Sequence, residues 1–144
     1  MNKRILWIFL LLIPCLPILF GLGTFIYPRY SEYSDLTISH LPNAVYILNT
    51  IRSEGFIPLW SDLLMAGYPF SADPLSGIWY PPGWIGILIH APYGYNVSFA
   101  LHLLWGGLGM AFFLSRSGLK KTAAVFGGIA FAAMPKLFAH LALG

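Results

Sequence analysis

Charge is what this sequence has least of. Only 9% of its 144 residues are charged, whereas soluble domains carry about 25%. Because 58% of the residues are hydrophobic and the mean hydropathy is +0.72, the composition indicates an integral membrane protein. The net charge of +3 is small, and no basic run alternates with aromatic residues, so we expect no nucleic-acid partner. The lipid bilayer is the partner that the composition predicts.

Cysteine and the common catalytic motifs are also scarce. The lone Cys15 can form no intramolecular disulfide, and its apolar surroundings predict a buried, inert thiol. The sequence contains no glycine-rich phosphate loop, no His-x-x-x-His or cysteine pair typical of zinc sites, and no nucleophile elbow. These absences argue against the enzyme classes that such motifs define.

Three apolar runs predict three transmembrane helices, at 5–27, 95–115 and 122–144. The first run is longer than the 7–15 residues of a typical signal-peptide core, so we favour a retained helix over a cleaved signal. The third run is broken near Pro135, and the sequence is still apolar at Gly144. We therefore interpret the chain as truncated.

Small residues thin the third run at Ala124, Gly128 and Ala132, a spacing that lets another helix approach closely. We expect either oligomerisation or further helices of a longer protein to cover that row.

Two basic clusters orient these helices. Lys3 and Arg4 lie in the N-terminal segment 1–4, and the turn at 116–121 holds three more basic residues. Because lysine and arginine accumulate on the cytoplasmic side, both clusters place the N-terminus in the cytoplasm and the loop 28–94 outside. All five acidic residues lie in that loop.

The first half of the loop predicts one amphipathic helix over 39–54. Ser39 is a suitable N-cap, and Gly55 stands where a C-terminal glycine would end the helix. Its apolar residues recur at helical spacing and predict a helix that lies on the membrane surface. These residues are Leu41, Ala44, Val45, Leu48 and Ile51.

The stretch 56–82 is dense in proline, glycine and aromatic residues. Prolines at this density exclude a long helix or a central strand, and Trp and Tyr favour the lipid headgroup level. We expect a compact interfacial loop with a short helix near 61–66.

Asp35 is the candidate catalytic residue. It follows the first apolar run directly, where a partly desolvated carboxylate could act as a general base or bind a divalent metal. It could equally cap a helical turn that begins at Leu36. His40 lies near enough in sequence to share a site with it, or is a surface histidine. Asp62 and Asp73 could contact substrate, or form turns as aspartate often does.

The amino-acid sequence of the loop resembles the N-terminal part of the bacterial YfhO family, which looks related to the GT-C superfamily of polytopic glycosyltransferases. The resemblance rests on Ser34-Asp35, on 55–60 (Gly-Phe-Ile-Pro-Leu-Trp), on 66–70 (Ala-Gly-Tyr-Pro-Phe) and on 73–77 (Asp-Pro-Leu-Ser-Gly). It covers nearly the whole chain but only the first part of such a protein. Ser61-Asp62 departs from the Asn-Pro that the family often has.

This resemblance implies an all-α membrane fold with many spanning helices and a large first extracytoplasmic loop, in the cytoplasmic membrane of a bacterium. It also implies transfer of a sugar from a polyprenyl-phosphate donor to a cell-envelope acceptor. Asp35 matches the acidic residue that acts there as base or metal partner. Trp60 and Tyr68 would pack against the sugar or prenyl chain, or would serve as interfacial anchors.

Two other functions stay open. The chain could transport or present lipid-linked saccharides without catalysis, or it could be an inactive remnant. Because three helices are too few to enclose a lipid-sugar cavity, we expect no turnover by the 144-residue chain without the remaining helices of a full-length protein.

Overall fold

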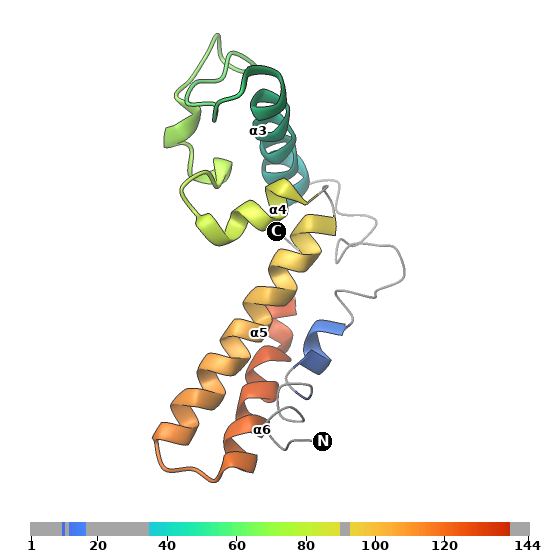
Figure 1. The fold of residues 1–144 in the computed structure, drawn as a ribbon, viewed down its shortest axis with the longest axis vertical. Coiled ribbons are helices and arrows are strands. Elements are labelled where there is room, and N and C mark those ends of the chain that lie inside the picture. The colour runs from blue at the N-terminus through green and yellow to red at the C-terminus, as the bar shows by residue number, and fades with distance from the viewer. Residues whose placement is uncertain (1–9, 11, 17–34, 90–92, 139–144) are drawn as a thin grey trace. The chain divides into compact units, whose positions relative to one another are not determined.

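The computed structural model describes residues 10, 12–16, 35–89 and 93–138 (Figure 1). Over these residues the chain is helical, and its sole extended pairing is an isolated bridge between Ser61 and Tyr68. The expected all-α class is confirmed at this level. The chain forms two compact units, Met1–Pro28 with Phe99–Ala142 and Arg29–Ser98 with Leu143–Gly144. We call the second the loop unit and describe each by itself.

The helix α5 (Tyr93–Arg116) is the one described helix long and apolar enough to cross a bilayer. It confirms that the predicted span 95–115 is helical. Only 22% of its most apolar window is buried inside the molecule, which is unlike the core helix of a soluble protein. Large apolar side chains are exposed at positions that follow helical spacing, and a stripe of this kind suits contact with lipid. They are Leu101, Trp105, Leu108 and Phe112.

The helix α6 (Lys121–Ala132) follows after a turn in which Gly118 has φ +88°. It ends at Ala132, with Ala133 as its C-cap, which confirms the predicted break ahead of Pro135. The helix has 12 residues and does not confirm a span over 122–144, of which 139–144 lie outside the described residues.

The small-residue row of α6 is buried within this unit. A Cβ atom added at Gly127 would overlap Leu114 of α5, and one added at Gly106 of α5 would lie 3.2 Å from the Phe131 ring. The short helix η1 (Ile13–Cys15) also packs against α6. The sequence predicts that oligomerisation or further helices of a longer protein cover this row, whereas in the described structure the row is already buried within its own chain.

Cys15 is buried, as predicted, and its thiol donates a hydrogen bond to the Ala100 carbonyl over 3.2 Å. Its surroundings are apolar residues of α5 and of the segment after α6, among them Leu103 and Leu137. The remainder of the predicted first span lies outside the described residues.

In the loop unit a π-helical turn, η2 (Leu36–His40), runs directly into α3 (Leu41–Glu54). The predicted start at Ser39 is therefore wrong, because the helix begins earlier. Pro42 explains the turn, since proline has no N–H to donate and its ring would collide with the Ile38 carbonyl in a regular α-helix. The preceding amide of Leu41 bonds to the Leu36 carbonyl, one residue further back than in an α-helix. The predicted end is confirmed, with Gly55 at φ +78°.

The buried face of α3 differs from the predicted one. Ala44 is buried as expected, but Val45 is 49% exposed, and Ile47 and Thr50 are buried in its place. The reason is that α3 packs against the following loop, whereas the prediction assumed a helix lying on lipid. A core of five buried side chains joins the two, and partly buried aromatic residues surround it. The five are Ala44, Ile47, Phe70, Ile78 and Ile87.

The loop that follows is a chain of short turns, as its prolines predict. It contains η3 (Phe70–Ala72), η4 (Pro74–Ser76), η5 (Pro81–Gly83) and α4 (Trp84–Leu88).

The predicted short helix near 61–66 is wrong. Ser61 and Tyr68 instead pair through two backbone hydrogen bonds of 3.0 and 2.9 Å. The tight turn between them places Met65 and Ala66 at φ +54° and +59°, and Gly67 follows at φ +107°. A backbone with three successive positive φ values cannot form a right-handed helix.

Gly67 should tolerate substitution poorly. Ala would be strained at its positive φ, and the new Cβ atom would lie 2.7 Å from Nε1 of Trp60. We expect Gly67→Ala to lower the free energy of unfolding by at least about 2 kcal/mol. Chemical denaturation in detergent micelles measures this change.

Gly77→Ala is the matched control, because Gly77 has φ +67° but nothing within 4 Å of an added Cβ atom. It should cost only about 1 kcal/mol of backbone strain. Equal losses for the two variants would contradict the packing of Trp60 against Gly67.

Candidate functional site

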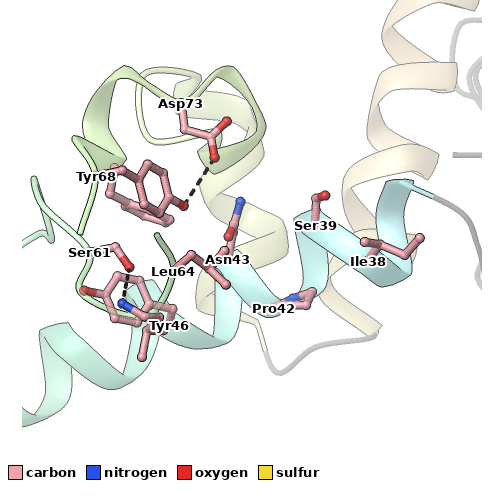
Figure 2. Close-up of a pocket in the computed structure, with 11 residues that line it drawn as sticks. Ile38, Ser39, Pro42, Asn43, Tyr46, Ser61, Leu64, Tyr68 and Asp73 are labelled. Atoms are coloured by element: carbon pink, nitrogen blue, oxygen red, sulfur yellow. Dashed lines mark hydrogen bonds between the residues drawn. The ribbon is translucent and has the colours of Figure 1, made fainter. Parts of the chain in front are cut away.

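A pocket of about 300 Å³ lies in the loop unit, between η2 with the start of α3 and the loop that contains the Ser61–Tyr68 pair (Figure 2). The helix contributes Ile38, Ser39, Pro42, Asn43 and Tyr46. The loop contributes Ser61, Leu63, Leu64, Tyr68, Phe70 and Asp73. One wall is therefore aromatic, polar groups stand beside it, and leucines complete the lining.

The carboxylate of Asp73 is held by local backbone structure. Its Oδ1 accepts a hydrogen bond from the Leu75 amide over 2.8 Å, which caps η4. This confirms the prediction that Asp73-Pro74 begins a turn. The second oxygen, Oδ2, lies 3.5 Å from the Tyr68 hydroxyl, a long contact that leaves room for a tighter partner (Figure 2). One oxygen of Asp73 is thus structural, and the other faces the pocket.

The aromatic wall is built around Phe70, whose side chain is only 1% exposed. The rings of Tyr46 and Tyr68 pack edge-on against it, with centroid distances of 5.0 and 6.1 Å. The Tyr46 hydroxyl donates to the Trp60 carbonyl over 3.1 Å, so it ties α3 to the loop. Tyr68 is then the tyrosine whose hydroxyl is paired with a side chain of the pocket.

Asn43 provides a second tie between the two walls. Its side-chain amide donates to the Leu75 carbonyl over 3.2 Å, next to the turn that Asp73 caps. The amide and the carboxylate are therefore fixed by the same η4 turn. This arrangement gives the pocket donors and acceptors in positions that do not depend on a ligand.

The pKa of Tyr68 is raised above its ordinary value of 10.0. Burial of the hydroxyl is the largest cause, and the negative charge of Asp73 and its hydrogen bond add to it. Each effect favours the neutral phenol over the phenolate. Tyr68 is therefore a hydrogen-bond donor at physiological pH.

The structure brings together two of the predicted site residues, Tyr68 and Asp73. Asp35 does not line the pocket. It is exposed, it directly precedes η2 with a helical backbone, and its side chain makes no capping hydrogen bond. The cap that we weighed as an alternative role is therefore not formed.

Trp60, Asp62 and His40 also lie outside the pocket lining. Nε1 of Trp60 donates to Oδ1 of Asp62 over 2.8 Å, so these two exposed residues partner each other. The backbone carbonyl of His40 accepts a hydrogen bond from the Tyr95 hydroxyl over 3.0 Å, which fastens the start of α5 to the helix. Their predicted substrate contacts receive no support from this geometry.

Sequence reasoning missed Asn43, Tyr46, Ser61 and Phe70. One signal for the first two was available, because Asn43 and Tyr46 are three residues apart and so share a face of the helix. Ser61 and Phe70 reach the pocket only through the turn at 62–67, whose conformation the residue types do not favour.

The part of the chain that the structure describes holds no group of three His, Cys, Asp or Glu side chains placed to bind a metal ion. No protein-family model, curated protein or solved structure matches this chain. The function must be argued from the site.

The titration of Tyr68 tests the geometry of this pocket. We expect its phenol to ionise above pH 10, and Asp73→Asn to lower that pKa without returning it fully to 10.0, because burial remains. Since the pKa is raised in the folded state, its contribution to stability is complete below pH 10 and is lost as the pH rises through the folded value.

Carbon-13 labelling of the tyrosine Cζ atoms and NMR between about pH 9 and 12 measures this titration. Tyr68→Phe identifies the signal. An unchanged midpoint in Asp73→Asn would contradict the pairing of these two side chains.

Proposed function

We propose that the pocket binds the polar head of a lipid-linked saccharide, and that the chain belongs to a membrane glycosyltransferase acting on the outer face of a bacterial cytoplasmic membrane. The observation that carries this proposal is the pairing of an aromatic wall with fixed hydrogen-bonding groups, Asn43, Tyr68 and Asp73. The apolar helix α5 supports a membrane setting for the same chain.

The chemistry of the lining suits a sugar. Sugar hydroxyls need both donors and acceptors, and the pocket offers a neutral phenol and a carboxylate oxygen that lie 3.5 Å from each other. Carbon–hydrogen faces of a sugar ring pack well on aromatic side chains such as Tyr46. The volume of about 300 Å³ is at the small end of ligand sites and suits a head group better than a long chain.

The rim of the pocket suits the lipid part of such a substrate. Leu63 and Leu64 line the pocket and are also 69% and 62% exposed. A ligand whose polar head contacts Asp73 could therefore lay an apolar chain over these leucines. A purely hydrophilic saccharide would leave them in water.

Asp35 is the proposed catalytic base. Its carboxylate is exposed and forms no cap, and it lies one turn before Ile38 and Ser39 of the pocket. In the proposed reaction Asp35 accepts the proton of an acceptor hydroxyl as that oxygen bonds to the anomeric carbon. The bond from that carbon to the phosphate oxygen breaks, and the polyprenyl phosphate leaves with its electron pair. Positioning and charge stabilisation carry the remaining catalysis.

One observation favours the alternative, a protein that binds and presents lipid-linked saccharides without catalysis. Asp35 does not line the pocket. In that case the pocket alone carries the function, and the carboxylate of Asp35 is dispensable.

Binding to the pocket is tested with a polyprenyl-phosphate hexose and the 144-residue chain in lipid nanodiscs, by native mass spectrometry. We expect Asn43→Ala and Asp73→Ala each to weaken binding about tenfold, because each removes a fixed hydrogen-bonding group. Asn49→Ala is the matched control, since Asn49 is an exposed residue of α3 that does not line the pocket. Equal affinity in all variants would contradict the site.

Catalysis is tested separately with Asp35→Asn in the chromosomal gene. We expect loss of the glycan modification with unchanged protein level, because an amide cannot accept the proton. The purified Asp35→Asn chain should still bind the polyprenyl-phosphate hexose. If Asp35→Asn keeps the glycan modification while Asp73→Ala loses it, the result would support presentation of the saccharide in place of catalysis.

A further inference from the structure

The turn at residues 63–66 exposes a run of large apolar side chains. Leu63, Leu64 and Met65 are consecutive, and Met65 is 93% exposed. In water such a tip is unfavourable, because apolar surface is stabilised by leaving water. We call these four residues the 63–66 turn.

The backbone of this turn is built for the exposure of those side chains. Met65 and Ala66 both have positive φ, and the Gly67 amide donates to the Leu64 carbonyl over 2.9 Å. A turn of this type strongly prefers asparagine and glycine at its two central positions. Methionine and alanine stand there at a cost in backbone strain. The Ser61–Tyr68 pair and the packing of Trp60 on Gly67 hold the turn in this form.

The charges around the turn do not suit an acidic binding partner. No lysine or arginine lies between Arg52 and Arg116. The one charge beside the turn is Asp62, which accepts the indole hydrogen bond of Trp60. Trp60 is itself 55% exposed and carries the apolar ring with a polar edge that favours the lipid headgroup level. Neutral lipid therefore fits this surface, and an acidic protein or membrane does not.

The position of the turn in its unit also points to lipid. Leu63 and Leu64 line the pocket together with Ile38, an exposed apolar residue of η2. Two residues further, the His40 carbonyl is bonded to the Tyr95 hydroxyl, at the start of α5. The turn and η2 therefore line the same pocket, and η2 is bonded to the first turn of α5 within the loop unit.

We propose that the 63–66 turn inserts into the outer leaflet of the bilayer and anchors the rim of the pocket at the level of the lipid headgroups. Leu63, Leu64 and Met65 would contact the acyl chains next to the headgroups. Trp60 would lie at the interface with its Asp62 bond intact. The pocket would then open at the depth where the head of a lipid-linked molecule lies.

A single fluorescent probe tests this insertion in the full chain. Cys15→Ser removes the native thiol and keeps a donor for the Ala100 carbonyl. Met65→Cys then carries an environment-sensitive nitrobenzoxadiazole label in phosphatidylcholine vesicles. Because Met65 is almost fully exposed, the substitution removes no packing. Ser53→Cys is the matched control, since Ser53 is exposed between Arg52 and Glu54 at the end of α3.

We expect the Met65 probe to be quenched by lipids that carry a spin label near the headgroup, and to be protected several-fold from aqueous iodide relative to the Ser53 probe. Equal access of iodide to both probes would overturn the proposal. Protection from iodide without quenching by spin-labelled lipid would mean that protein, such as a second copy of the chain, covers the turn. Dependence on added phosphatidylglycerol would also contradict insertion by apolar contact alone.

Discussion

The loop unit depends on the burial of Phe70 between α3 and the turns that follow. Phe70 is among the largest fully buried side chains, and Ile47 of α3 is its fully buried neighbour in the same core. This core closes a loop of more than twenty residues, and the rings of Tyr46 and Tyr68 both pack against Phe70. Without it, neither wall of the pocket would have a fixed position. The pocket thus depends on one apolar core, and polar groups line the pocket that this core holds in place.

The polar contacts around Phe70 act as ties and not as the source of stability. Asn43 and Tyr46 both donate from α3 to loop carbonyls, and Asp73 caps the turn that Asn43 reaches. Each such bond contributes about 1 kcal/mol net, which is less than the burial of one large aromatic side chain. These hydrogen bonds orient the side chains, so that the Tyr68 hydroxyl and one oxygen of Asp73 face the pocket.

Local patterns predicted the elements that local physics decides. Gly55 ended α3 and Pro135 followed the end of α6, because backbone geometry at those residues leaves little choice. The apolar length of α5 was equally plain. The periodicity of apolar residues predicted that Val45 is buried, on the assumption that the helix lies on lipid. In the structure the following loop packs on a neighbouring face of α3, and Val45 is exposed. The turn at Met65 and Ala66 was not predictable, since neither residue favours positive φ. Of the site, Tyr68 and Asp73 were found, while Phe70 needed the tertiary contact.

The central claim is that this pocket receives the head of a lipid-linked saccharide. The most direct measurement is photocrosslinking in nanodiscs with a polyprenyl-phosphate hexose that carries a diazirine on the sugar, followed by peptide mass spectrometry. The account predicts adducts on peptides that contain the pocket residues of α3 and of the loop, Asn43 and Tyr68 among them, and competition by the unmodified compound. Adducts confined to α5 and α6, or adducts that the unmodified compound does not displace, would contradict it.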